Sequence, residues 1–387
     1  MLKIVVPDRE RHLGAISDLW GSLRRQCAGH LTDPYCDWAT SRVGLLDDRV
    51  VTFWGVFGLD LRVDSASLRT AGVNWVATHS GYRRKGRMEE TGQAALAAMR
   101  EQGYDLTVMN GIEGYYERFG YVFAWPKVNF YLSADVLPSD KPGVQIQEFT
   151  PGHREDLAAI YNRTYAGVTG TAVRPTHRSF KWPGEFQGYA WLDESGKTAG
   201  YVVGSRGSRS GYPFDCVDAA GDPEAILQVV GFLAHRWGYR EIQFDRIPLR
   251  SMLVQQLRQL GCTVEADYPQ SGGYMIRIVN LHSLLEKLCG VLSERLKRSH
   301  FQDWQGHLLI GLEKEGVILE IDRGSVCLAP SGTTDHAIRG GDRLAQLVVG
   351  TEAPDEVMDG MQVNGQAKEL VEVLFPKQDP QLSVVDL

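Results

Sequence analysis

The chain has 387 residues, 43% of them hydrophobic and 23% charged, and its formal net charge is −7. This length suits two or three domains with sizeable cores, and the acidic balance lacks the basic footprint of a nucleic-acid-binding protein. The six cysteines show no C-x-x-C spacing, so we expect neither a disulfide framework nor a metal site. The first residues do not resemble a signal peptide and no apolar run is long enough to span a membrane. The sequence therefore predicts a cytoplasmic protein without a membrane partner.

The first third of the chain alternates between strand patterns and helix patterns. Apolar residues recur at every second position in the expected strands and at helical spacing between them. Helices that cross between strands predict a mixed α/β sheet covered on both faces. The expected helices span residues 8–23, 91–102 and 115–119, and the expected strands span 3–6, 50–63, 67–78, 106–109 and 121–133.

Residues 138–143 have the composition of a linker, and two further units are expected after it. The middle unit repeats the order of elements of the first, but its loop 219–224 has two acids and no arginine and should repel a pyrophosphate. Trp182-Pro183-Gly184 is interpreted as a loop anchor in this unit. We therefore predict two mixed-sheet domains followed by an α+β domain, with ranges 1–137, 143–280 and 281–387.

The last region begins with a helix pattern over residues 281–297, followed by a meander of strands over 307–330 and three short helices. Leucine and valine residues form a continuous apolar stripe along the first helix. The stripe fits either a lipid tunnel or a packed core, and the packed core is the preferred interpretation.

The most informative stretch is residues 73–88, where an expected strand ends in a basic loop. His79-Ser80-Gly81 breaks the strand pattern, and Arg83-Arg84-Lys85-Gly86-Arg87-Met88 leads into the next helix. A glycine that turns the backbone into a helix leaves N–H groups pointing outward, and such groups bind anions together with the helix N-terminus. The natural ligand of this loop is a pyrophosphate. A basic turn on a solvated surface is the alternative interpretation.

This loop resembles the acetyl-coenzyme-A loop of GNAT N-acetyltransferases, whose signature is R/Q-x-x-G-x-G/A. Arg83 and Gly86 match this signature, whereas Met88 is larger than the glycine or alanine at its last position. These enzymes also carry a tyrosine on a short helix after the next strand, and Gly114-Tyr115-Tyr116-Glu117-Arg118-Phe119-Gly120-Tyr121 supplies one. The resemblance makes Tyr116 the general acid that protonates the leaving thiolate. For Tyr115, Phe119 and Tyr121 we prefer packing.

The two motifs, the second GNAT-like unit and a sterol-carrier-protein-like third region together resemble the enhanced intracellular survival (Eis) acetyltransferases over the whole chain. Proteins of this family carry a bulky residue where Met88 stands. The resemblance implies transfer of acetyl from acetyl-CoA to a primary amine of a small molecule, aminoglycosides among them, by direct attack in a ternary complex. It also implies a homo-oligomer, a hexamer.

The resemblance implies the site residues as well. Val76 and Thr78 would present backbone groups to the pantetheine and the acetyl carbonyl, and the pyrophosphate would bind to Arg83, Arg84, Gly86, Arg87 and Met88. The family's general base is the terminal carboxylate, here that of Leu387, although a leucine departs from the aromatic residue found near the family's terminus.

Three residues of the early helical region, Asp33, Asp37 and Trp38, lie where acceptor contacts are expected, but a surface position is the preferred interpretation. His79 is expected to be a turn residue. The alternative function is a non-catalytic coenzyme-A sensor, or a lipid carrier that uses the third region.

Overall fold

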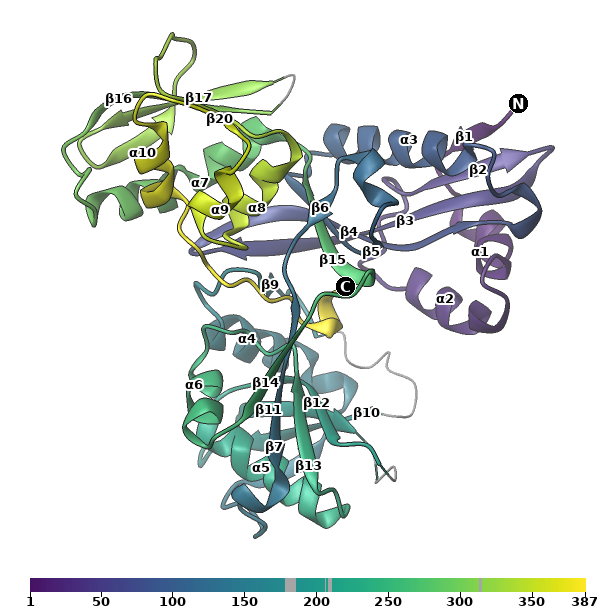
Figure 1. The fold of residues 1–387 in the computed structure, drawn as a ribbon. Coiled ribbons are helices and arrows are strands. Elements are labelled where there is room, and N and C mark those ends of the chain that lie inside the picture. Colours follow the sequence, from purple (N-terminus) through teal and green to yellow (C-terminus); the bar gives the residue numbers. More distant parts are fainter. Residues whose placement is uncertain (178–185, 206, 208–210, 313–314) are drawn as a thin grey trace. The chain divides into compact units, whose positions relative to one another are not determined.

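The computed structural model describes residues 1–177, 186–205, 207, 211–312 and 315–387 (Figure 1). The chain forms two compact units, each built from two separate stretches of sequence. The first unit contains Met1–Trp125 and Pro269–Gln378, and the second contains Pro126–Tyr268 and Asp379–Leu387. The three domain ranges expected from the sequence stay a prediction. Trp182-Pro183-Gly184 lies outside the described residues.

The first unit is centred on a mixed sheet. The strand order is β1 (Lys3–Val5), β2 (Arg42–Leu46), β3 (Arg49–Val63), β4 (Ala66–Thr78), β5 (Leu106–Ile112), β15 (Ser271–Ile278) and β6 (Val122–Phe123). Among these neighbouring pairs, β4 and β5 run parallel and the others run antiparallel.

Helices cover both faces of this sheet, as the sequence predicts (Figure 1). The helix α3 (Arg87–Glu101) packs Ala95 and Met99 against Trp54 and Val56 of β3. The helices α1 (Arg9–Asp18) and α2 (Arg24–Leu31) pack on the other side, where the next residues along the strand, Phe53 and Phe57, point. This alternation follows from the period of two along a strand.

A β-bulge interrupts the pairing of β3 with β4 close to the end of β4. Phe53 pairs with Ala77 and Gly55 pairs with Asn74. The single residue Trp54 on β3 therefore stands opposite two residues on β4, Trp75 and Val76. Trp75 has a φ of 58° and its backbone N–H donates to Oδ1 of Asn74 over 2.8 Å. A bulge bends its strand and leaves backbone groups unpaired, so the end of β4 is shaped to expose backbone near Val76.

The third region of the sequence belongs to the first unit. Its helix α7 (Leu281–Lys297) buries all six residues of the predicted stripe, Leu284, Leu285, Leu288, Val291, Leu292 and Leu296. The five-stranded sheet beside it has the order β18 (Ser325–Leu328), β17 (Gly316–Asp322), β16 (Gln305–Gly311), β19 (Ala337–Arg339) and β20 (Gln362–Asn364). The short helices are α8 (Leu344–Val349), α9 (Pro354–Met358) and α10 (Ala367–Leu374).

Asp105 joins this third region to the central sheet of the first unit. Its carboxylate is fully buried and accepts hydrogen bonds from Arg69 N at 2.8 Å and Ser283 Oγ at 2.6 Å. It also forms an ion pair with Lys287 of α7. A buried carboxylate is stable only when such partners surround it, so this junction fixes α7 against β4 and β5.

The second unit is a seven-stranded sheet with helices on both faces. Its order is β14 (Thr263–Asp267), β7 (Lys127–Ser133), β13 (Glu241–Asp245), β12 (Phe214–Ala220), β11 (Thr198–Ser205), β10 (Phe186–Leu192) and β8 (Gln145–Glu148). The helices α5 (Pro223–Arg236) and α6 (Met252–Gln259) share one core cluster, and α4 (Arg154–Thr164) packs into another. A hairpin turn joins β10 to β11, where Asp193 N donates to Lys197 O.

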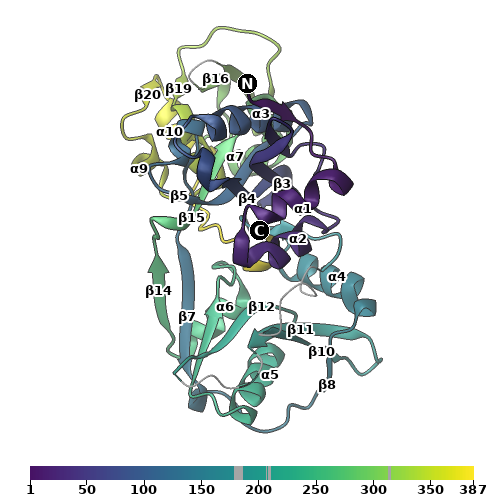
Figure 2. The same cartoon turned by 90° about the vertical axis from the view of Figure 1, so that its right-hand side faces the viewer.

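The strand predicted over residues 121–133 is divided between the two units. Its first part is β6 in the sheet of the first unit, and its second part is β7, which lies beside β14 in the second (Figure 2). Pro126 stands between them and has no backbone N–H to donate to a ladder. The strands β14 and β15 were not predicted from the sequence.

Candidate active site

The basic loop of the first unit joins β4 to α3, as the sequence predicts. His79 turns the chain, since its Nδ1 accepts a hydrogen bond from Gly81 N at 3.2 Å. Arg84 and Gly86 both have left-handed backbones, with φ values of 61° and 71°. Left-handed residues at such a turn aim successive N–H groups to one side and form an anion-binding nest.

The N-terminus of α3 is open because its N-cap is Gly86, which has no side chain. The amides of Glu89 and Glu90 donate to Gly86 O at 3.0 and 3.3 Å. The first two amides of the helix, those of Arg87 and Met88, have no carbonyl within the helix to bind. These amides and the positive end of the helix dipole favour a bound phosphate.

The N-terminus of the corresponding helix in the second unit, α5, is capped by a side chain. The N-cap of α5 is Asp222, whose carboxylate accepts a hydrogen bond from Ala225 N at 2.9 Å. A carboxylate already occupies the position that a phosphate would take. The contrast supports the sequence-based expectation that only the first unit binds a pyrophosphate.

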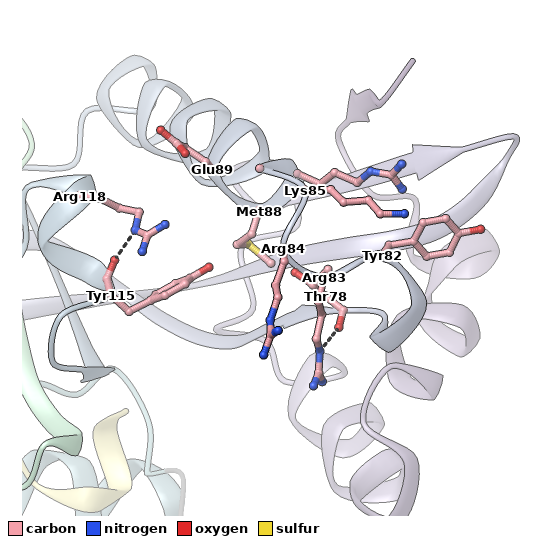
Figure 3. Close-up of a pocket in the computed structure, with 11 residues that line it drawn as sticks. Thr78, Tyr82, Arg83, Arg84, Lys85, Met88, Glu89, Tyr115 and Arg118 are labelled. Atoms are coloured by element: carbon pink, nitrogen blue, oxygen red, sulfur yellow. Dashed lines mark hydrogen bonds between the residues drawn. The ribbon is translucent and has the colours of Figure 1, made fainter.

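A pocket of about 440 Å³ surrounds the loop in the first unit (Figure 3). Five basic side chains and one acidic side chain line it, so its charge favours an anion. The complete lining is Thr78, Tyr82, Arg83, Arg84, Lys85, Gly86, Arg87, Met88, Glu89, Tyr115 and Arg118.

Most of the predicted cofactor residues meet in this pocket, and Val76 does not line it. Thr78, Arg83, Arg84, Gly86, Arg87 and Met88 all do. Val76 packs against the core cluster beneath. Met88 is also part of this cluster and is only 7% exposed, so its bulk is accommodated in the core beside the pocket.

The basic side chains are held by contacts within the loop. Arg83 Nε donates to Thr78 O over 3.2 Å, which ties the loop to the end of β4 (Figure 3). The Arg87 guanidinium lies 4.8 Å from the centre of the Tyr82 ring, within range of a cation–π contact. Tyr82 and Lys85 were not among the predicted site residues, although both stand in the basic loop that the sequence singles out.

The tyrosine segment contributes to the pocket through Tyr115 and Arg118. Arg118 Nε donates to Tyr115 O over 2.9 Å, and its guanidinium lies 4.6 Å from the centre of the Tyr115 ring. The sequence favours a packing role for Tyr115, whereas the structure places it on the pocket wall (Figure 3). Arg118 was not among the predicted site residues, although it stands in the same sequence motif as Tyr116.

Tyr116 begins the short helix Tyr116–Phe119 and is 7% exposed. It does not line the pocket but lies in the core cluster directly next to Tyr115, with ring centroids 4.9 Å apart. Burial, and secondarily the neighbouring Tyr115, raises the pKa of Tyr116 above its usual value. In the part of the chain that the structure describes, no hydrogen-bond partner of the Tyr116 hydroxyl is found.

The terminal residue Leu387 belongs to the second unit. It follows the short helix Val384–Asp386, in which Val385 and Asp386 are buried. Of the three expected acceptor contacts, Asp37 is already hydrogen-bonded within the first unit, since its carboxylate accepts from Thr40 Oγ1 at 2.6 Å and from the Tyr104 hydroxyl at 2.7 Å. Asp33 Oδ1 accepts from Tyr35 N at 2.8 Å, and Trp38 Nε1 donates to Leu31 O at 3.2 Å.

Residues 31–124 match the family profile of an acetyltransferase (GNAT) domain, and this part of the chain is such a domain. The whole chain resembles solved structures at 16% sequence identity, which establishes the fold. A GCN5-related N-acetyltransferase from Anabaena variabilis aligns over 100% of both chains with a TM-score of 0.77. A probable N-acyltransferase of unknown function from Enterococcus faecalis aligns over 99% of both chains with a TM-score of 0.78. Eis1 from Mycobacterium abscessus aligns over 98% of both chains with a TM-score of 0.69.

No curated protein sequence matches the chain. Across the described ranges, no helix is both long and apolar enough to cross a membrane. Those ranges also contain no group of three or more histidine, cysteine, aspartate or glutamate side chains arranged to hold a metal ion.

Proposed function

We propose that the protein is an acetyl-CoA-dependent N-acetyltransferase that acetylates a primary amine of a small molecule, such as an aminoglycoside. The observation that carries this proposal is the basic pocket at the open N-terminus of α3, inside the residues that match an acetyltransferase domain. The full-length similarity to a GCN5-related N-acetyltransferase and to Eis1 supports the same class of reaction.

The pyrophosphate of acetyl-CoA would bind at the nest. The amides of Arg87 and Met88 would donate to it, and Arg83, Arg84 and Lys85 would neutralise its charge. The bulge exposes the β4 backbone near Val76, and Thr78 ends that strand at the pocket. These two residues would offer backbone groups to the pantetheine arm and the acetyl carbonyl.

The reaction would be a direct attack in a ternary complex. The amine lone pair attacks the thioester carbonyl carbon, a tetrahedral intermediate forms, and the carbon–sulfur bond then breaks. The amine loses one proton to a general base, and the leaving thiolate takes one proton from Tyr116. The raised pKa keeps the Tyr116 phenol protonated before the reaction. Because a thiol has a lower pKa, about 8.5, the phenolate formed in the transfer regains a proton at once, and the proton held by the general base balances it through solvent.

The terminal carboxylate of Leu387 would be the general base. Two observations support this part of the proposal: the full-length similarity to Eis1, and the burial of the residues directly before Leu387. A disordered chain end could not hold a general base in a fixed position relative to the substrate. By the same similarity we propose that the third region is a sterol-carrier-protein-like domain, that the protein is a homo-oligomer, a hexamer as the family resemblance implies, and that it works in the cytoplasm.

The experiment is a thiol-release assay with acetyl-CoA and a panel of amines that includes polyamines, amino sugars and aminoglycosides. The proposal expects release of coenzyme A that depends on one class of amine, with the acetylated amine identified by mass spectrometry. Tight binding of acetyl-CoA without turnover on any amine would instead support a sensor. Fatty-ligand binding without coenzyme binding would support a lipid carrier.

A further inference from the structure

Trp75 lies inside β4 and yet has a left-handed backbone, with a φ of 58°. Bulky residues rarely adopt this conformation, because the side chain then crowds the neighbouring backbone. A strained residue persists only where the surrounding structure holds it, and such residues concentrate at functional sites. The contacts that hold Trp75 therefore bear on the function of this strand.

The strained backbone turns the Trp75 side chain to the opposite face of the sheet. Ala71 and Val73 pack in the cluster that contains α3, and a period of two would place Trp75 beside them. Trp75 instead belongs to the cluster that contains α1 and α2, whereas Val76 returns to the cluster of α3. An extra residue in one strand moves the following side chains to the other face. The position of Val76 therefore depends on that of Trp75.

One hydrogen bond and two ring contacts hold the Trp75 indole. Its Nε1 donates to His30 Nδ1 over 3.2 Å. The Trp20 ring lies edge-on to the indole, with the centroids 5.0 Å apart and the planes at 89°, and the His30 ring lies edge-on at 5.3 Å. An indole has a single N–H and no acceptor, so its bond to His30 determines the direction of the ring.

The helix α2 holds His30 in place. Cys27 and Leu31 share its side of the helix and are completely buried in the same cluster as Trp75. The carbonyl of His30 accepts a hydrogen bond from Asp33 N over 3.0 Å, directly after the end of the helix. A packed helix, rather than a loop, therefore presents the imidazole to Trp75.

We infer that His30 and Trp75 are positioning residues, which hold the β4 bulge so that the backbone near Val76 stays available to the pantetheine arm of acetyl-CoA. The inference rests on the proposed function, in which Val76 and Thr78 offer backbone groups to that arm. Without the hydrogen bond, Trp75 would relax toward an extended backbone and shift the backbone of Val76. The basic loop would keep its shape, because its own contact from Arg83 Nε to Thr78 O stays in place.

The test compares the binding of two ligands to the full-length protein by calorimetry. Coenzyme A carries the pantetheine arm, whereas its nucleotide half, an adenosine diphosphate with a further phosphate on the ribose, lacks it. His30→Leu removes the acceptor and Trp75→Phe removes the donor, so each variant breaks the same hydrogen bond. His30→Asn is the conservative variant, because its amide oxygen can still accept from the indole.

Trp304→Phe is the matched control. It removes another indole hydrogen bond of the first unit, from Trp304 Nε1 to Gln366 Oε1 over 3.0 Å. Trp304 also has a histidine ring beside it, since His336 lies at a centroid distance of 5.4 Å. The control therefore repeats the same chemical change away from the β4 bulge.

His30→Leu and Trp75→Phe should each weaken the binding of coenzyme A by about 3- to 10-fold, which is the size of one hydrogen bond. Binding of the nucleotide half should stay within about twofold of the native value, as for a substitution away from the site. The double variant should lose no more than the weaker-binding single variant, because both changes remove one interaction. His30→Asn should bind coenzyme A more tightly than His30→Leu, and Trp304→Phe should match the native protein for both ligands.

The inference is overturned if coenzyme A binding falls by less than about threefold in both single variants, which is below the expected size of the hydrogen bond. It is also overturned if both ligands lose affinity equally, since the first unit as a whole would then be disturbed, or if the two losses add in the double variant.

A failure of the proposed function gives a different result, because it appears in the native protein as coenzyme binding without acetylation of any amine. Hydrogen exchange of the amides from Asn74 to Thr78 tests the bulge without any ligand. These amides should exchange faster in His30→Leu than in the native protein, and unchanged exchange would overturn the inference.

Discussion

The Tyr116 ring lies edge-on to the Trp54 indole, with the ring centroids 6.0 Å apart and the planes at 79°. Phe119 and Tyr121 also approach the Tyr116 ring, each with its centroid 6.2 Å away. This aromatic surrounding is what excludes water and raises the pKa of Tyr116. The same packing would hold the hydroxyl in one place, as a general acid requires.

The first prediction concerns Tyr116. Tyr116→Phe should lower turnover with little change in acetyl-CoA binding, because the phenol matters only when the thiolate leaves. A general acid contributes about 10²–10⁴-fold, and the loss should be read from kcat under conditions where chemistry is rate-limiting. A variant that keeps more than about a third of the native kcat would show that Tyr116 is not the acid.

Tyr115→Phe is the matched control, because Tyr115 is the adjacent tyrosine and lines the basic pocket. The phenyl ring would keep its contact with the Arg118 guanidinium, so we expect kcat close to the native value. If Tyr115→Phe loses turnover and Tyr116→Phe does not, the acid is the residue on the pocket wall and the sequence-based assignment is displaced by one position.

The second prediction separates charge from backbone conformation in the basic loop, where the pyrophosphate is proposed to bind. Arg84→Gly removes the charge but still accepts the left-handed φ of 61°. Hydrogen bonds to charged groups contribute about 1.5–3 kcal/mol, so the KM for acetyl-CoA should rise by about 10- to 100-fold. Gly86→Val should raise it by a different route, because a β-branched residue is strained at a φ of 71°.

Gly81→Ala is the control for this loop, since its Cβ would meet only the His79 ring at an ordinary 3.6 Å. The KM for acetyl-CoA should then stay within about twofold of the native value, which is the size of a surface substitution. Native-like values for Arg84→Gly and Gly86→Val together would mean that the pyrophosphate binds elsewhere.

The position of the basic loop between β4 and α3 was predictable because its information is local. A strand, a glycine at the helix entrance and neighbouring arginines lie within 16 residues, from Val73 to Met88. The apolar alternation expected in the strand over residues 50–63 is local in the same way, and in β3 Phe53 and Phe57 belong to one core cluster whereas Trp54 and Val56 belong to the other.

Other features depend on long-range pairing and carry no local signal. All five residues of β14 are exposed, so the strand has no apolar alternation, and it exists through its pairing with β7. Arg174 and Asp386 are 212 residues apart in sequence, so nothing near either residue indicates that their side chains form a buried ion pair. The pocket position of Tyr115 was missed because adjacent tyrosines look alike in sequence, and only the turn of the short helix separates them.

The third prediction concerns the terminus. Adding a few residues after Leu387 should abolish turnover while acetyl-CoA still binds, because the extension moves the carboxylate without removing any side chain. Leu387→Ala, which keeps the carboxylate and shortens only the side chain, should keep most of the activity. If the extended protein is as active as the native one, another acid in the protein or a water relay takes the amine proton.

The fourth prediction concerns the pH dependence of stability. His177 Nε2 lies 2.9 Å from Asp218 Oδ2, and burial, only partly opposed by Asp218, lowers the pKa of His177. In the unfolded chain the imidazole of His177 has its usual pKa of about 6.5. Below that pH the unfolded chain therefore binds a proton at His177 more readily than the folded chain does. Stability from this group is complete above that pH and decreases as the pH falls toward the folded pKa.

His177→Gln should reduce this loss of stability, since a glutamine can still donate to Asp218 but does not titrate. The measurement is the urea midpoint of the native protein and the variant between pH 7.5 and 5. We expect the two curves to converge as the pH falls. Parallel curves over this range would show that His177 has the same pKa in the folded and unfolded chains.

The most direct measurement of the central claim is a transfer experiment with acetyl-CoA that carries an isotopic label in its acetyl group. The native protein is mixed with labelled acetyl-CoA and each amine of the panel, and the products are separated by mass. The account predicts a labelled amide on at least one amine, formed in equal amount to the released coenzyme A and formed at least about 10²-fold more slowly by Tyr116→Phe. Labelled acetate as the only product, or labelled acetyl-CoA recovered intact after binding, would contradict it.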